Sequence, residues 1–134
     1  MNGKITIYVA DGSIEPLRDW AQRSLGPLHL VYHDPTHETT IYHSDREETW
    51  SVSLQTGIAN GMFTEVVFRS QGVPLPWQTD IECARQAAQD LQTEIHCDPG
   101  SMGTNPFDPY EWWRIAEAQE CLFSWFLPHE ADAG

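Results

Sequence analysis

Hydrophobic and polar residues alternate over several short stretches of the chain, which is typical of β-strands that bury one face. Ile5, Ile7 and Val9 would share one face of a first strand. The stretches 28–33 and 39–43 alternate in the same way and are close enough to pair. The first part of the chain therefore predicts one strand followed, after an interval, by a pair of strands.

Two stretches have the 3.6-residue periodicity of amphipathic helices instead. The first follows Ser13, a residue typical of helix N-termini, and ends at Gly26. The second begins near Thr79, whose spacing to Glu82 is that of a capping box. The buried stripe of the first helix would consist of Leu17, Trp20, Ala21 and Leu25, and that of the second of Ile81, Ala84, Ala88 and Leu91.

Asn60-Gly61 is the strongest turn signal in the chain, because both positions of such a hairpin turn need a positive φ. With the turn placed there, Leu54 would lie opposite Val67. One face of the hairpin would then carry Trp50, Val52, Leu54, Ile58, Phe63 and Val67. Since a slip of one residue would turn this whole set toward water, we expect a well-defined register.

The C-terminal part begins with a predicted return strand over residues 93–97 and an exposed loop over residues 98–109, which is rich in Gly and Pro. Residues 109–126 then fit two structures. Pro109 and the period of the apolar residues after it suit a helix. The runs 112–115 and 121–126 equally suit two aromatic strands around a short turn.

The predicted order of elements is β-α-β-β-β-β-α-β followed by the ambiguous segment, which is the order of an α+β fold. We expect a largely antiparallel sheet of six to eight strands with two or three helices packed on one face. The 134 residues have the length of one domain, and no repeat or linker divides them. We therefore expect a single domain over residues 1–134.

The charge of the chain narrows its possible functions. It contains 20 Asp and Glu residues against 7 Lys and Arg, a net charge of −13. Such a chain repels phosphate backbones and anionic lipids, which argues against nucleic-acid and membrane partners. It suits a basic partner, with an attraction that weakens as salt rises. Residues 80–134 hold 11 of the acids and only 2 of the bases.

Cysteine usage and the N-terminal pattern predict a cytoplasmic protein. Cys83, Cys97 and Cys121 are odd in number, widely spaced and in no C-x-x-C pair, so we expect reduced thiols. No stretch approaches the roughly 20 apolar residues that span a bilayer. The first residues lack the apolar block and cleavage site of a signal peptide.

Histidine supplies the only candidate metal site. His29, His33, His37 and His43 lie within fifteen residues, and zinc accepts imidazole nitrogen and carboxylate oxygen. Solvent-facing histidines on a two-stranded ribbon explain the cluster as well, and we favour that interpretation. No serine-hydrolase, phosphate-binding or zinc-protease motif occurs. We therefore expect neither a cofactor nor an enzyme, and the alternative is a small metal-binding protein or metal-dependent hydrolase that uses the four histidines.

Acidic and aromatic side chains are interleaved toward the C-terminal end. Trp112 and Trp113 cannot both point inward from one strand, so at least one exposed ring is expected. Exposed rings beside carboxylates suit a surface that binds Arg and Lys of a partner. The candidate partner-binding residues are Asp98, Asp108, Tyr110, Glu111, Trp112, Trp113, Glu117 and Glu120.

In size, acidity and element order, the chain resembles the immunity proteins of bacterial polymorphic and contact-dependent toxin systems. Its run DPYEWWRI, residues 108–115, is similar to the P-Y-x-x-x-x-I runs that precede a late hairpin in some of these proteins. The resemblance implies a non-enzymatic inhibitor that covers the active site of a cognate toxin domain such as a nuclease. A second binding alternative is a phage-encoded inhibitor that mimics nucleic-acid charge, with carboxylates spaced along one face like phosphates.

Overall fold

The computed structural model describes residues 2–44 and 50–126. Its strands are β1 (Asn2–Ala10), β2 (Leu28–Asp34), β3 (Thr39–Ser44), β4 (Trp50–Gly57), β5 (Phe63–Gln71), β6 (Ile95–Cys97), β7 (Glu111–Ala116) and β8 (Gln119–Ser124). Its helices are α1 (Ile14–Leu25), the four-residue α2 (Ile58–Gly61), α3 (Asp80–Leu91) and the 3-10 turn η1 (Gly100–Met102). The predicted α+β fold is confirmed.

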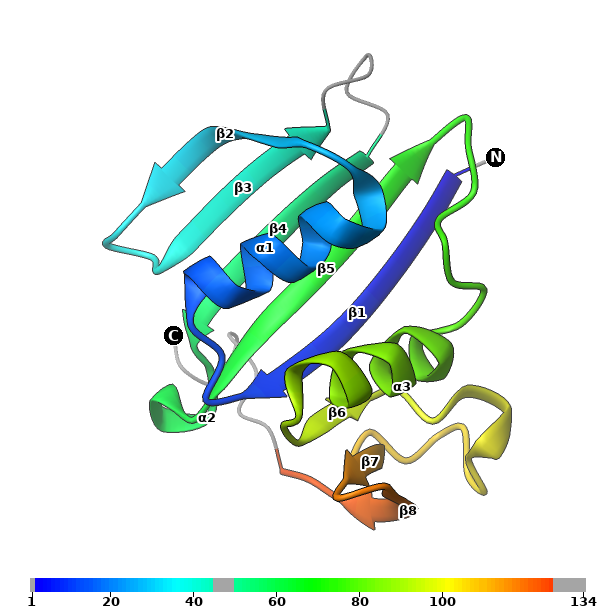
Figure 1. Ribbon diagram of the computed structural model, residues 1–134. Coiled ribbons are helices and arrows are strands. Elements are labelled where there is room, and N and C mark those ends of the chain that lie inside the picture. The colour runs from blue at the N-terminus through cyan, green and yellow to red at the C-terminus, as the bar shows by residue number, and fades with distance from the viewer. Residues whose placement is uncertain (1, 45–49, 127–134) are drawn as a thin grey trace.

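The eight strands form one antiparallel sheet in the order β2-β3-β4-β5-β1-β6-β7-β8. The first strand of the chain, β1, lies inside the sheet between β5 and β6, and β2 and β8 form the two edges. Figure 1 shows that α1 and α3 cover the same face of the sheet, α1 toward β4 and α3 toward β1 and β6. In the described part of the chain, no helix has the length and hydropathy needed to cross a membrane.

The core lies between this face and the two helices. Ile5, Ile7 and Val9 of β1 point into it together, as the alternation predicts. Trp20 of α1 is 1% exposed and stacks on Trp77 with ring centroids 5.5 Å apart. Its indole Nε1 donates a hydrogen bond of 2.9 Å to Asp90 of α3. This indole therefore both fills the core and joins the two helices.

The turn of the β4–β5 hairpin forms where the sequence predicts it. Asn60 and Gly61 have φ values of 62° and 85°, so both occupy the left-handed region that an Asn-Gly turn favours. Ile58 lies opposite Phe63, which is also as expected. Ala59, with φ 53°, is left-handed as well. Three consecutive residues of the turn, and not the Asn-Gly pair alone, therefore have a left-handed backbone.

Farther from the turn, the predicted register is wrong by one residue. Leu54 lies opposite Val66, not Val67. β4 contains one more residue than β5 between this pair and the turn, and Gly57, with φ 80°, absorbs the extra residue. As a result Val66 and Phe68 enter the core beneath the helices, whereas Val67 faces the opposite side of the sheet.

The ambiguous segment 109–126 is a strand hairpin, so its helical interpretation is wrong. β7 pairs with β6 on one side and with β8 on the other, and Glu117-Ala118 forms the turn. Trp113 and Ile115 face the core, while Trp112 faces the helix-free side.

Candidate protein-interaction surface

Four of the predicted partner-binding residues lie in or beside the loop that joins β6 to β7, residues 98–110. Asp98 accepts a hydrogen bond from the backbone N–H of Gly100 at 2.7 Å. Asp108 accepts one from the backbone N–H of Tyr110 at 2.9 Å. These carboxylates therefore fix turns within the loop, as short acidic side chains do.

Glu111 holds the centre of the same loop. Its carboxylate accepts hydrogen bonds from the backbone N–H groups of Thr104 (2.7 Å) and Asn105 (3.1 Å), and from the Thr104 hydroxyl. The hydrogen bond from the Thr104 side chain, helped by these amides, holds the pKa of Glu111 below its usual range. The ionised carboxylate thus ties the first residue of β7 to a loop that has little regular structure of its own.

The loop fixed in this way carries apolar side chains into solvent. Phe107 is 91% exposed and Met102 is 48% exposed. At the end of the loop, Tyr110 packs against Phe126 with ring centroids 4.6 Å apart, and both rings are exposed, 42% and 71%. Sequence reasoning missed Phe107, Met102 and Phe126. The available signal was the position of Phe107 in the run Pro-Phe-Asp-Pro, an apolar ring in a stiff polar loop.

The adjacent tryptophans point to opposite faces, but neither is a free anchor. Trp113 is 8% exposed, and its Nε1 donates a 3.0 Å hydrogen bond to Glu120. Trp112 is half-buried and meets Tyr8 and Trp125 edge to face, at centroid distances of 5.4 and 5.0 Å. As expected, the two rings do not both point into the core, but other rings partly cover Trp112, so it does not project freely into solvent.

Trp112 belongs to a ring cluster on the helix-free face. The cluster consists of Tyr8, Phe63, His96, Trp112, Phe123 and Trp125. His96 lies at the centre of the cluster and is 3% exposed, and this burial lowers the pKa of its imidazole. Its Nε2 lies 2.5 Å from a carboxylate oxygen of Glu94. These rings stabilise the fold around β6 by packing on one another.

The last two predicted carboxylates differ in their surroundings. Glu120 binds Arg85 of α3 through both oxygens, at 3.0 and 2.9 Å, and the bond from Arg85 lowers the pKa of Glu120. Glu117 lies in the β7–β8 turn, is exposed, and forms no ion pair with any described residue. Glu117 is thus available to a ligand, whereas Glu120 is already engaged.

The four histidines lie on and beside the β2–β3 hairpin. His29 and His43 face each other across the pair, and His33 Nδ1 lies 2.9 Å from the Thr40 hydroxyl. His37 Nδ1 lies 2.5 Å from Asp34. Among the described residues, no three His, Cys, Asp or Glu side chains are placed to share one metal ion.

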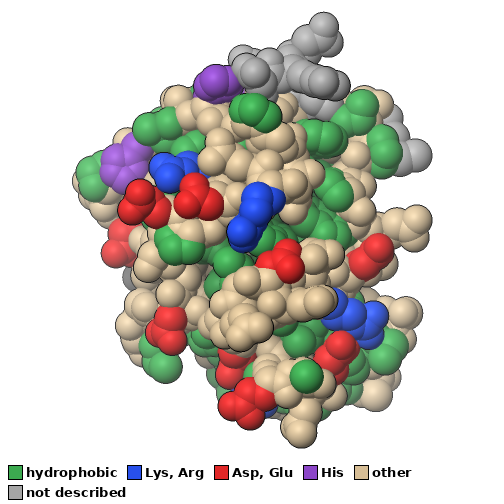
Figure 2. All heavy atoms as spheres, viewed as in Figure 1, with side chains coloured by type: hydrophobic (Ala, Val, Ile, Leu, Met, Phe, Trp, Pro, Cys, Tyr) green, Lys and Arg blue, Asp and Glu red, His purple; other side chains and the backbone are tan. Residues whose placement is uncertain are grey.

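Carboxylates are not confined to the C-terminal part of the molecule. Figure 2 shows acidic side chains scattered over the face that carries the helices, with few basic ones between them. Of the described acids in the 98–120 region, those without an ion pair are Asp98, Asp108, Glu111 and Glu117. The loop therefore carries exposed apolar side chains and carboxylates without ion pairs, and the turn at the other end of β7 carries one further such carboxylate.

Comparison with known proteins gives no relative for this chain. No family model matches the sequence, and no significant match is found among curated proteins or solved structures.

Proposed function

We propose that this chain is a cytoplasmic, non-enzymatic acidic protein that binds a basic protein partner and covers its active site. The partner class follows the resemblance to immunity proteins: a cognate toxin domain, with a nuclease as the expected activity. The observation that supports this best is the loop of residues 98–110, which holds Phe107 91% exposed.

An exposed Phe ring on a fixed backbone is favourable for binding. Large aromatic side chains are frequent energetic hot spots when a partner's pocket removes them from water. Since Glu111 and the short acidic side chains already order the loop, little further conformational entropy is lost on binding. Met102, also exposed, adds an adaptable apolar side chain in the same loop.

The net charge of −13 also favours binding to a basic partner. A negative protein attracts a basic partner over distances longer than contact, and steered association of this kind reaches on the order of 10⁸ M⁻¹s⁻¹ at low salt. The same field repels nucleic acid. A nuclease covered by this protein would therefore lose its substrate both by steric exclusion and by charge.

Affinity capture followed by an activity assay tests the proposal. The chain, immobilised, should retain a basic protein from the native cell at about 50 mM salt, less of it at about 500 mM, and should inhibit that protein's activity at a one-to-one ratio. Phe107→Ala should weaken binding by about 10- to 100-fold, because a hot-spot truncation removes about 1.4–3 kcal/mol.

Leu30→Ala is the matched control. Leu30 is 58% exposed on β2, at the sheet edge opposite β8, so its truncation removes a comparable apolar surface far from the loop. Partner binding should be unchanged in this variant. A captured partner that keeps full activity when saturated with this protein would contradict the inhibitory function. Equal losses of partner binding in Phe107→Ala and Leu30→Ala would contradict the role of the loop.

A further inference from the structure

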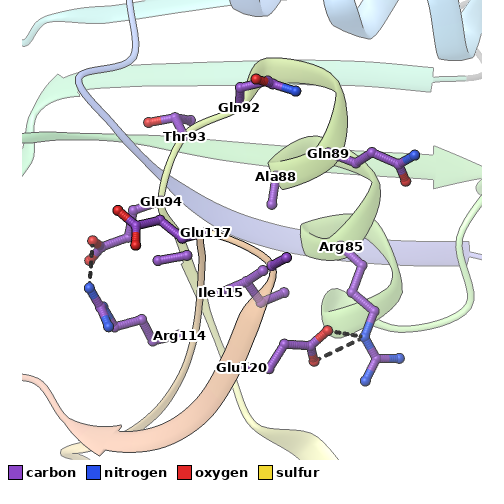
Figure 3. Close-up of a pocket in the computed structure, with 12 residues that line it drawn as sticks. Arg85, Ala88, Gln89, Gln92, Thr93, Glu94, Arg114, Ile115, Glu117 and Glu120 are labelled. Carbon is purple, nitrogen blue, oxygen red and sulfur yellow. Dashed lines mark hydrogen bonds and ion pairs between the residues drawn. The ribbon is translucent and has the colours of Figure 1, made fainter.

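A cleft of about 730 Å³ lies between the C-terminal half of α3 and the β7–β8 hairpin. Figure 3 shows α3 on one side of it, with Arg85 and Gln89, and β7 with Arg114 on the other. Elements that are distant in the sequence thus form the two walls. No local sequence pattern indicates this cleft, because its walls come from residues 85–94 and 114–120.

Both arginines of the cleft form ion pairs. Arg85 binds Glu120, and the Arg114 guanidinium donates a 3.0 Å hydrogen bond to Glu94. Glu94 also lies against His96, so its carboxylate is fixed from two directions. The Arg85–Glu120 pair links α3 to β8, the Arg114–Glu94 pair links β7 to the residue before β6, and each carboxylate offsets the charge of its arginine.

The remaining polar groups include a carboxylate and two side-chain amides, whose oxygen atoms can accept hydrogen bonds. Glu117 reaches the cleft from the turn without an ion-pair partner among the described residues. The amide side chains of Gln89 and Gln92 line it from the end of α3. The last turn of α3 contains no basic residue, so the partial negative charge of its terminal carbonyl groups is not offset there.

Apolar surface lies beneath these acceptors. It is provided by Ala88, Ile115, Ala116 and Ala118. An apolar bed below a negative rim matches a side chain with a methylene stem and a cationic end, since such residues pack their stems and direct the charge to polar groups.

We propose that this cleft takes the side chain of an arginine from the basic partner. The inference specifies how that partner is held and therefore rests on the proposed function. Arginine suits the site better than lysine, because its guanidinium offers five N–H donors in a plane and several separate acceptors surround the cleft. Glu117 supplies the opposing charge, and the terminal carbonyl groups of α3 accept further hydrogen bonds.

A short peptide tests the cleft without the partner. Acetyl-Gly-Arg-Gly-amide, titrated into the ¹⁵N-labelled chain, should shift the amide resonances of residues 89–93 and 116–118. The isosteric variant Glu117→Gln should weaken the peptide's apparent Kd about three- to fivefold, the range of one exposed ion pair. Glu38→Gln removes the same charge at the opposite end of the sheet, in the β2–β3 loop, and should bind as the wild type does.

Two results would overturn the proposal. One is the same set of shifts with acetyl-Gly-Leu-Gly-amide, which would show that the cationic group is not recognised. The other is equal affinity in wild type and Glu117→Gln, with both spectra showing a folded chain. In either case, a loss of partner binding in Phe107→Ala would still support the proposed function. If the peptide binds but no inhibited partner is found, the arginine site in the cleft would be supported and the proposed function would not.

Discussion

Asp80, the first residue of α3, is a carboxylate placed where water is scarce. Burial against the sheet raises its pKa to about 6, and the nearby charge of Asp98 adds to the effect. The backbone N–H of Thr6, which bonds to it, and the charge of Lys4 oppose the rise only in part. In the unfolded chain the same group has a pKa of 3.8. The folded protein therefore holds a proton between these two values that the unfolded chain releases.

The sign of the resulting pH dependence is the reverse of the usual one for a carboxylate. Because the folded state binds more protons, this group makes the free energy of unfolding fall as pH rises from about 4 to about 6. Asp80→Asn keeps an acceptor for the Thr6 N–H and removes the charge. We expect it to raise the free energy of unfolding by about 1 kcal/mol at pH 7.5, with a smaller gain at pH 5, measured by urea denaturation.

Asp90→Asn is the control with the opposite sign. The pKa of Asp90 lies below its usual value, chiefly because it accepts the Trp20 indole hydrogen bond. Its amide variant should therefore be less stable than the wild type at pH 7.5. If both variants changed the free energy of unfolding equally, the assignment of a buried carboxylate with a raised pKa at the start of α3 would be contradicted.

At the scale of the elements, the β7–β8 turn carries strain that its sequence does not relieve. Glu117 and Ala118 have φ values of 52° and 63°, in a two-residue turn where Asn and Gly are the favoured residues. Ala118→Gly should raise the melting temperature by about 3 °C, because glycine adopts this conformation without steric cost. Ala116→Gly, within β7, should lower the melting temperature, since glycine weakens an extended strand. Calorimetry of both variants checks that one melting temperature rises and the other falls.

The elements themselves follow from the sequence to different degrees. The order of strands and helices and the Thr79–Glu82 cap could be predicted, because each depends on residues close in the chain; the Thr79 hydroxyl does accept the Glu82 N–H, at 3.1 Å. The β4–β5 register could not. Val66 and Val67 are both apolar, so alternation fits either register, and the extra residue at Gly57 decides between them.

The candidate surface could be predicted in its location but not in its chemistry. The frequency of acidic and aromatic residues after β6 indicated this region from the sequence alone. Which side chains in it remain free depends on contacts that span the chain, such as Arg85 with Glu120 and Tyr8 with Trp112. Phe107, by contrast, remains 91% exposed in its loop.

At the scale of the whole molecule, the excess of carboxylates opposes compaction. Salt should therefore stabilise the fold: between about 20 and 300 mM NaCl at pH 7.5, we expect the melting temperature to rise by about 3–5 °C. The increase should be smaller at pH 5, where more carboxylates are protonated. Over the same salt range, partner binding should weaken, so the two responses have opposite signs. A melting temperature that falls with salt would contradict the view of the charge as repulsive within the chain.

The interior position of β1 also has a consequence during synthesis. Its two neighbours, β5 (Phe63–Gln71) and β6 (Ile95–Cys97), are made long after it, so β1 waits for both of its partners. Pairing between such distant segments slows folding and leaves hydrophobic strand edges open in the meantime. A nascent chain stalled before residues 95–97 would have no β6 to cover one side of β1, and would be a natural substrate for a chaperone.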